Sequence, residues 1–141
     1  MKFRPRSCCA LMLFVALVTI IVSGCGDKSN PVSAGGSSIV GTWNLTSIVM
    51  GQISVTAGPT TLTNVETYNS DFTCKEISHD YMETPPTSDT GTGTWMTTGN
   101  KLIVSSAGSA DTSTYALSGN TLTLSSTVPT YGIVTMTFAR Q

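Results

Sequence analysis

Apolar and polar residues alternate in short runs over most of the chain after its first quarter. In the first run, 39–49, Trp43, Leu45 and Val49 share one face of an extended strand, while threonine and asparagine occupy the other face. The last run, 133–140, alternates in the same way. A period of two is typical of a strand with one buried face. The pattern therefore predicts an all-β domain that begins near residue 39.

Two tight hairpins are predicted by an internal repeat. Segments 95–104 and 115–124 each carry Gly-Asn between two alternating runs. Glycine supplies the positive φ that the first position of such a turn requires. Counting outward from the two turns gives the cross-strand pairs, which are Thr98 with Lys101, Thr97 with Leu102, Trp95 with Val104, Leu117 with Leu122 and Tyr115 with Leu124.

The middle of the chain predicts a third hairpin and one long loop. The runs 62–68 and 72–77 alternate and are joined by Asn69-Ser70-Asp71. Residues 83–93 contain two adjacent prolines followed by Asp, Thr and Gly, which are turn and loop formers. We therefore expect the longest loop of the domain at 83–93.

A different pattern occupies the N-terminus. Lys2, Arg4 and Arg6 precede an almost unbroken apolar run over 10–22. This run of about a dozen residues is shorter than the roughly 20 that a membrane-spanning helix needs. A basic start, a short apolar run and small residues at its end are typical of a cleaved secretory signal. An uncleaved anchor and ordinary signal cleavage without lipid are the alternatives.

The end of this segment, Val22-Ser23-Gly24-Cys25, resembles a bacterial lipobox. The resemblance implies that Cys25 receives a diacylglycerol and an amide-linked acyl chain of the palmitate kind. It divides the chain into a signal peptide at 1–24, a lipidated cysteine with a flexible tether at 25–38, and a domain at 39–141. Two or more acyl chains hold a protein stably on a membrane.

The residue after the lipobox cysteine bears on location. Gly26 stands at this position. By resemblance to the sorting rule of enteric bacteria, glycine there directs a lipoprotein to the outer membrane rather than the inner one. We expect the protein to be lipid-anchored in the bacterial cell envelope. The periplasmic face and the surface face of the membrane are the two alternatives.

Removal of the signal makes the remaining chain acidic. Three of the seven Lys and Arg residues leave with the signal, whereas all eight Asp and Glu residues stay. Threonine and serine fill most other polar positions, and threonine is a strand former. A basic patch is missing from the sequence, so nucleic-acid binding is not expected.

Cysteine use changes in the same way. Cys8 and Cys9 leave with the signal, and lipid occupies the sulfur of Cys25. Cys74 remains, so an intramolecular disulfide is not expected. We interpret Cys74 as a small buried hydrophobic residue, with a reactive or intermolecular thiol as the alternative.

Gly41-Thr42-Trp43 at the start of the domain and Arg140 near its end resemble the signature of lipocalin-like proteins, which belong to the broad calycin group. The resemblance to the bacterial lipocalin-like lipoproteins covers 39–141 and includes the hairpin around Trp95. It implies an up-and-down antiparallel β-barrel in which Trp43 packs at the closed end and Arg140 crosses over it. Stacking of a guanidinium on an indole contributes roughly 0.5–2 kcal/mol.

Strand edges support the same architecture on physical grounds. Short antiparallel strands with one apolar face leave exposed edges unless the sheet closes on itself. A two-sheet β-sandwich satisfies the same alternation and stays open as the alternative.

Residues capable of catalysis or metal binding are sparse. His79 is the only histidine, and Glu76, Asp80 and Glu83 near it lack ligand-like spacing. We expect His79 in a solvated loop. No nucleophile motif is present, and no pair stands out among the eight acids. The sequence predicts neither an enzyme nor a bound metal or cofactor.

The large aromatic residues give the remaining prediction. Trp43 and Phe138 are expected to fill the closed end of the barrel. A barrel of this size can hold one small ligand. The residues predicted to line its pocket are Trp95, Tyr115, Tyr68 and Phe72.

We therefore expect a membrane-anchored lipoprotein whose barrel binds a small apolar or amphipathic ligand in the cell envelope. One alternative is a structural or interaction lipoprotein with a solid barrel that meets another envelope protein. The other is a hydrolase inhibitor that acts through its loops, such as 81–93.

Overall fold

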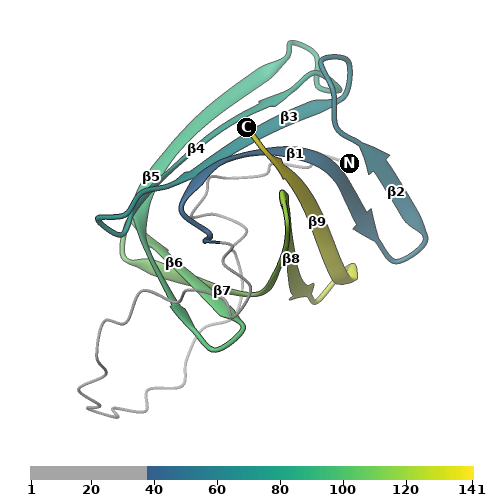
Figure 1. Ribbon diagram of the computed structural model, residues 1–141. Helices are drawn as coiled ribbons and strands as arrows, with labels where there is room; N and C mark the ends of the chain where they lie inside the picture. Colours follow the sequence, from purple (N-terminus) through teal and green to yellow (C-terminus); the bar gives the residue numbers. More distant parts are fainter. Residues whose placement is uncertain (1–37) are drawn as a thin grey trace.

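The computed structural model describes residues 38–141, which form nine antiparallel strands in a meander (Figure 1). The predictions for the signal, for Cys25 and for most of the tether lie outside these residues. The strands are β1 (Gly41–Met50), β2 (Ile53–Thr56), β3 (Leu62–Tyr68), β4 (Thr73–Asp80), β5 (Thr87–Thr98), β6 (Lys101–Ser106), β7 (Ser109–Ser118), β8 (Thr121–Val128) and β9 (Gly132–Arg140). No helix within 38–141 is long and apolar enough to cross a membrane.

The sheet closes because β1 pairs with the last strand as well as with the early ones. Trp43 to Met50 run antiparallel to β9 from Arg140 back to Val134. On its other side, β1 pairs with β3 in its first half and with β2 in its second half. The result is an eight-stranded up-and-down barrel with β2 alongside it. The predicted all-β barrel is confirmed, and the β-sandwich alternative is set aside.

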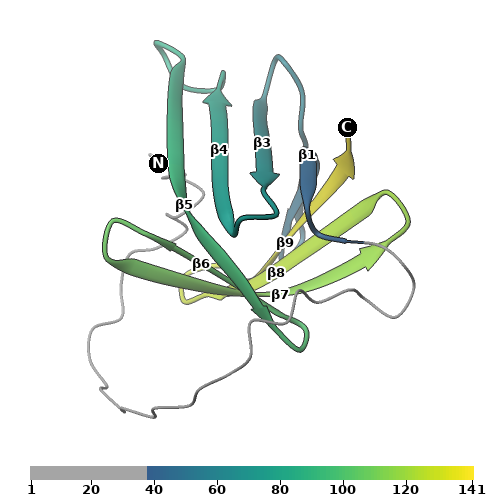
Figure 2. The same ribbon diagram turned by 60° about the vertical axis from the view of Figure 1, so that its left-hand side comes forward.

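The wall consists of two groups of strands (Figure 2). β3, β4 and the first part of β5 stand side by side, and β6, β7 and β8 cross at an angle to them. β5 belongs to both groups, since residues 87–94 pair with β4 and residues 94–98 pair with β6. One wall of the interior is thus built by β3, β4 and β5.

The hairpin predictions are confirmed. Trp95 pairs with Val104 and Leu117 pairs with Leu122, in the expected registers. The turn glycines, Gly99 and Gly119, have φ values of 58° and 56°. These local signals were sufficient because a two-residue turn determines the register of the strands that it joins.

The first strand departs from simple alternation. The β1–β9 register shifts between Leu45 and Ser47, so that one extra residue of β1 is left unmatched. Such a bulge reverses which residues face inward. Ile48 accordingly packs against the core, and Val49 is 38% exposed. The prediction that Val49 shares a face with Trp43 and Leu45 was wrong.

Two further predictions about the middle of the chain need correction. The predicted loop at 83–93 is confined to residues 81–86, because β5 already begins at Thr87 and pairs with β4. Threonine-rich sequence accepts a half-exposed strand despite its glycines. His79 lies on β4 rather than in a loop, and its ring stacks on Tyr81 with centroids 6.0 Å apart.

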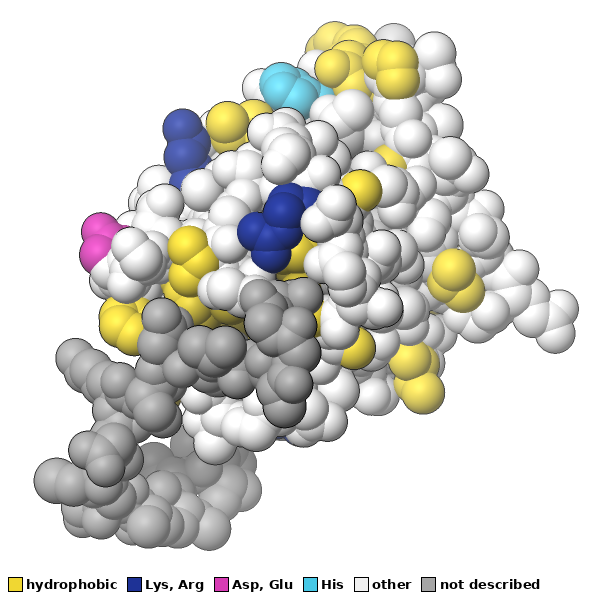
Figure 3. All heavy atoms as spheres, viewed as in Figure 1, with side chains coloured by type: hydrophobic (Ala, Val, Ile, Leu, Met, Phe, Trp, Pro, Cys, Tyr) yellow, Lys and Arg dark blue, Asp and Glu magenta, His cyan; other side chains and the backbone are white. Residues whose placement is uncertain are grey.

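The outer surface carries few charges. Figure 3 shows a face of mostly uncharged side chains and backbone, with isolated charged residues and small apolar patches. The large apolar side chains that are most exposed in the described part are Met82, Ile133, Ile53 and Met96. They come from different elements, so they do not form one extended apolar strip along a single strand.

Candidate ligand-binding site inside the barrel

One end of the barrel, where β1 begins and β9 ends, is closed by a tryptophan and an arginine. Trp43 is fully buried, and its Nε1 donates a hydrogen bond to the carbonyl oxygen of Ile39 at 2.8 Å. The guanidinium carbon of Arg140 lies 4.2 Å from the centroid of the Trp43 ring. Arg140 also donates through Nη1 to the carbonyl oxygen of Val40 at 2.9 Å, and through Nη2 to that of Ser38. The structure thus brings together the two residues predicted to close the barrel.

The glycine of Gly41-Thr42-Trp43 makes room for this arrangement. Gly41 has a φ of +143°, and a Cβ atom built on it would lie 2.6 Å from Nη1 of Arg140. Residues other than glycine rarely adopt this backbone conformation. The clash between a Cβ atom and Nη1 would also push the guanidinium away from the indole. The short sequence motif is therefore explained by one contact across the end of the barrel.

Three of the four residues predicted to line a pocket form an aromatic cluster at this same end. The ring of Trp95 packs edge-on against the ring of Tyr68, with centroids 5.7 Å apart. It is tilted against the ring of Phe72, with centroids 5.4 Å apart. Its Nε1 donates to the carbonyl oxygen of Asn69 at 3.0 Å. Tyr68 and Trp95 are 1% and 2% exposed. Their surfaces are occupied by one another and by the β3–β4 turn.

Tyr115 lies apart from this cluster. It is half-buried on β7, opposite Leu124 on β8, and it packs against the core. The four predicted pocket residues therefore do not surround one site. They extend the apolar packing that begins at Trp43, and they do not form a ligand-facing surface.

Beside Trp43, the inward positions of β3 and β4 are polar, and Glu66 stands directly opposite Trp43 in the β1–β3 register. Alternation from Tyr68 places Glu66 inward on β3, and alternation from Cys74 places Glu76 and Ser78 inward on β4. Glu66 and Glu76 are each 5% exposed, and Ser78 is 7% exposed. Buried carboxyl groups are rare in proteins unless they are paired or serve a function.

Hydrogen bonds satisfy only part of this polar group. The hydroxyl of Tyr68 donates to Oε2 of Glu66, and Nδ2 of Asn64 donates to Oε1 of Glu76. Oε2 of Glu76 and Oδ1 of Asn64 are buried without a hydrogen-bond partner among the described residues. An unpaired buried acceptor costs about 1–3 kcal/mol.

The two glutamates share an electrostatic environment. Glu66 stands directly opposite Glu76 in the β3–β4 register. Burial raises the pKa of Glu66 to about 7, against a lowering effect of the hydrogen bond from Tyr68. Burial, together with the negative charge of Glu66, raises the pKa of Glu76 to about 8, against a lowering effect of the hydrogen bond from Asn64. Near neutral pH the pair therefore retains a proton that exposed glutamates would have lost.

A glycine adjoins the carboxyl pair on the third strand of this wall. Gly91 on β5 faces Glu76 across the β4–β5 ladder and is buried. A glycine inside a strand often marks a bend or a place where a ligand approaches the backbone closely. Gly91 therefore contributes no side chain beside Glu76.

Two more polar side chains face inward from the strands across the barrel. Asp111 on β7 pairs with buried Val104, and Ser126 on β8 pairs with buried Val134. Both carboxylate oxygens of Asp111 and the hydroxyl of Ser126 are buried without a partner among the described residues. Burial raises the pKa of Asp111 to about 6. The polar interior is thus not restricted to β3 and β4.

The sequence analysis missed Glu66 and Glu76 as site residues. It treated Glu76 only as a neighbour of His79. The signal was nevertheless present, because counting from Tyr68 and Cys74 along the predicted hairpin places both glutamates on the inward face. Their burial could not be read in this way, since it depends on the opposite wall of the barrel.

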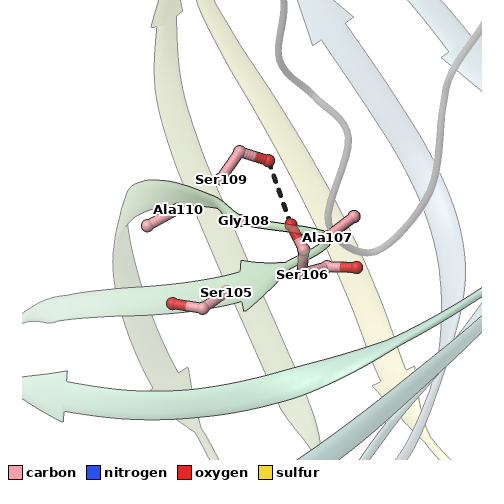
Figure 4. Close-up of a pocket in the computed structure, with 6 residues that line it drawn as sticks. All are labelled: Ser105, Ser106, Ala107, Gly108, Ser109 and Ala110. Carbon is pink, nitrogen blue, oxygen red and sulfur yellow. Dashed lines mark hydrogen bonds between the residues drawn. The ribbon is translucent and has the colours of Figure 1, made fainter.

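The outer surface has a shallow hollow at the β6–β7 turn (Figure 4). It has a volume of about 380 Å³ and is lined by residues 105–110, which are serine, alanine and glycine. Ser109 donates to the carbonyl oxygen of Ser106 at 3.1 Å within it. These groups belong to one turn and are small, so the hollow is a feature of the turn rather than a built binding site.

Metal ligation is not indicated in the described part of the chain. Within residues 38–141, no three side chains of His, Cys, Asp or Glu are arranged to hold a metal ion. His79 stacks on Tyr81 outside the carboxyl pair.

A closed up-and-down barrel, locked at one end by a tryptophan and an arginine, defines a lipocalin-like protein. The sequence comparison agrees: residues 39–137 match the lipocalin-like domain family, and the chain belongs to that family. The resemblance inferred from Gly41-Thr42-Trp43 and Arg140 is thereby confirmed. No curated protein and no solved structure matches the chain.

Proposed function

We propose that this protein is a non-enzymatic lipoprotein of the bacterial cell envelope whose barrel binds a small amphipathic molecule. A lipocalin-like barrel is consistent with ligand binding in general. The observation that carries the proposal is the unpaired, buried Oε2 of Glu76, a residue that faces Gly91 across the β4–β5 ladder. A molecule with a polar end can satisfy that oxygen while its apolar part contacts the aliphatic interior.

The energetics favour a binding barrel over a solid structural one. A barrel that served only as a scaffold would be more stable with apolar residues in place of Glu66 and Glu76, because buried charges and unpaired acceptors cost free energy. Functional sites are where such costs are retained. A purely structural role leaves the polar interior without an explanation.

The inhibitor alternative has lost most of its structural basis. Its loop was expected at 81–93, and the connection between β4 and β5 is only 81–86. An inhibitory loop must present an extended segment to its target, and residues 87–93 are instead committed to pairing with β4.

The experiment is native mass spectrometry of the protein purified from its own membranes. We expect a defined additional mass on the wild type. Gly91→Phe places a large side chain beside Glu76 and should abolish this additional mass. Gly58→Phe, in a turn with open space around it, should retain the additional mass. A wild-type spectrum without any additional species would contradict the proposal and favour the solid barrel.

A further inference from the structure

We infer that the molecule bound in the barrel carries a positively charged nitrogen group, and that Glu66 and Glu76 hold this group as carboxylates. The inference rests on the proposed function and specifies the chemical class of its ligand. It follows from the hydrogen-bonding capacity of the two glutamates and from the charges around them.

The unpaired groups of this wall require donors. In the ionised form of Glu76, Oε2 accepts hydrogen bonds, as Oδ1 of Asn64 does, and both atoms are buried without a partner among the described residues. Glu76 is 95% buried, as its 5% exposure shows, and faces inward between Cys74 and Ser78. An ammonium or guanidinium group offers several N–H donors at once, which suits acceptors on two neighbouring strands.

The charges around Glu76 are all acidic. Glu66 faces it from β3, the Cys74 thiol lies on its own strand, and Asp89 stands on β5; each of these groups raises the pKa of Glu76. Two like charges opposite one another on neighbouring strands destabilise a sheet. A cation between them would convert this repulsion into attraction, as charge-assisted hydrogen bonds do elsewhere.

The basic residues of the described chain lie elsewhere. Lys75 is exposed on the outward face of β4. Lys101 is exposed on β6, and its Nζ donates to Oγ1 of Thr114. Arg140 covers Trp43 at the closed end. The positive charge that would complement the carboxyl pair is therefore expected to come from the ligand.

On the strand next to the pair, Gly91 faces Glu76 and contributes no side chain that would compete with the cation for the carboxylate. The apolar part of the ligand would contact the aliphatic residues of the interior, which include Leu102, Val104, Leu122 and Leu124.

Binding in this way exchanges a proton for the ligand. The free pair holds a proton near neutral pH; when the cation arrives, the O–H bond of the carboxyl breaks and the proton leaves to solvent. The ammonium then donates N–H hydrogen bonds to the resulting carboxylate, and the charge is conserved. Affinity should therefore increase between pH 6 and pH 8.

The test compares three probes of similar shape and different charge. 2-Phenylethylamine, 2-phenylethanol and 3-phenylpropanoate are titrated into the intact protein in nanodiscs, with empty nanodiscs as the blank. Calorimetry is carried out at pH 6 and pH 8, in two buffers of different ionisation enthalpy. At pH 8, we expect the amine to bind at least about tenfold more tightly than the alcohol or the carboxylate. The amine should bind at least about threefold more weakly at pH 6 than at pH 8, and its binding should release protons.

Two variants separate the carboxyl pair from a general charge effect. Glu76→Gln should weaken amine binding at least about tenfold and reduce its pH dependence to the part that Glu66 contributes, and Glu66→Gln should weaken amine binding in the same direction. Glu83→Gln makes the same chemical change in the 81–86 loop and should leave amine binding unaltered. Far-ultraviolet circular dichroism of each variant establishes that the barrel is intact.

The possible results distinguish this inference from the proposed function. Equal or tighter binding of the alcohol or the carboxylate, or unchanged amine binding in Glu76→Gln, overturns the cationic class and leaves small-molecule binding in place. If none of the probes binds, a co-purifying cationic molecule supports the inference, and a neutral or anionic one overturns it. The absence of both probe binding and a co-purifying molecule overturns the inference and the proposed function together.

Discussion

Arg140 is held at one end of the barrel by an aromatic ring and by two backbone carbonyl groups. Its guanidinium lies over Trp43 and donates to Val40 and Ser38. Only a planar group with several donors can stack on a ring and form hydrogen bonds at its edge at the same time. This explains why a cation is tolerated on the inward face of the last strand.

We predict that Arg140→Ala lowers the free energy of unfolding by about 2–4 kcal/mol, because the stack and both hydrogen bonds are lost. Arg140→Lys should recover less than half of this loss, since an ammonium keeps the charge without the planar fork. Urea unfolding followed by tryptophan fluorescence measures both. Equal stability of Arg140→Ala and the wild type would show that the contacts contribute nothing.

Gly41 provides a second prediction at this scale. Gly41→Ala should lower the free energy of unfolding by about 1–3 kcal/mol, because the new methyl group meets Arg140 and the backbone conformation is strained. Gly58→Ala is the matched control, since nothing lies within 4 Å of its Cβ position. The same urea experiment should show Gly58→Ala within about 0.5 kcal/mol of the wild type.

At the scale of the element, β1 combines two inward faces in one strand. Trp43 and Leu45 face inward before the bulge, and Ile48 faces inward after it. The hydroxyl of Thr46, within the bulge, donates to the carbonyl oxygen of Thr137 at 2.9 Å. The bulge thus lets β1 change partners from β3 to β2 while it stays paired with β9.

The bulge predicts that substitutions at two neighbouring positions of β1 differ in their effect on stability. Ile48→Thr should destabilise the protein by about 1–2 kcal/mol, because a hydroxyl replaces apolar contacts of the core. Val49→Thr should stay within about 0.5 kcal/mol of the wild type, because Val49 is on the outer face. Thermal unfolding compares the two. A larger loss for Val49→Thr would indicate that β1 continues without the bulge.

The β3–β4 hairpin makes stability depend on pH. The pKa of Glu66 and that of Glu76 are raised from 4.5 to about 7 and about 8. Between pH 4.5 and about 8, the native protein binds more protons than the unfolded chain. The free energy of unfolding therefore falls as the pH rises through this range. The stabilising contribution is complete below about pH 4.5 and is lost as pH passes through about 7 and 8.

We therefore expect the urea midpoint to be lower at pH 8.5 than at pH 5, by an amount that corresponds to roughly a few kcal/mol. Glu76→Gln should reduce the change in urea midpoint between pH 5 and pH 8.5, because the neutral amide does not titrate and Glu66 remains. Glu83→Gln should retain it. This pH range lies above the titration of Asp71, whose pKa is lowered by hydrogen bonds from Thr73. A midpoint that rises between pH 5 and pH 8.5 would contradict the assignment.

At the scale of the whole molecule, the barrel removes the sheet edges that its nine short strands would otherwise expose. Closure depends on the pairing of β1 with β9, which brings residues from the two ends of the domain together. The lock at Trp43 and Arg140 lies at that seam. Its position suggests that the last strand completes the fold rather than nucleating it, since contacts so distant in sequence are costly to form early.

The proposed lipid anchor belongs to this scale as well. We predict that Cys25→Ser accumulates as an unprocessed or soluble precursor, because the sulfur proposed to receive the lipid is missing. Membrane fractionation followed by mass spectrometry of the N-terminus measures this. Cys74→Ser, a thiol replacement within the barrel, is the control and should be processed and anchored like the wild type. A processed Cys25→Ser protein in the membrane fraction would refute the anchor.

The candidate site could be predicted from the sequence only in part. The barrel-closing residues were accessible, because Trp43 lies at the start of the domain and Arg140 at its end in a recognisable pattern. The aromatic residues near Trp95 were assigned to a pocket because size and apolarity alone do not distinguish a residue that fills a core from one that lines a cavity. The carboxyl pair was missed because its two members are ten residues apart and become neighbours only through the β3–β4 register.

The sequence by itself determined most of the strands, the tight turns and the residues that share a face within each Gly-Asn hairpin. These follow from alternation and glycine-containing turns, which act over a few residues. The tertiary structure alone decided where alternation is interrupted in β1, which aromatic residues pack together, and that Glu66 and Glu76 are buried opposite one another. Burial and strand pairing depend on residues distant in the chain, and these determine the energetic cost and the chemistry of the carboxyl groups inside the barrel.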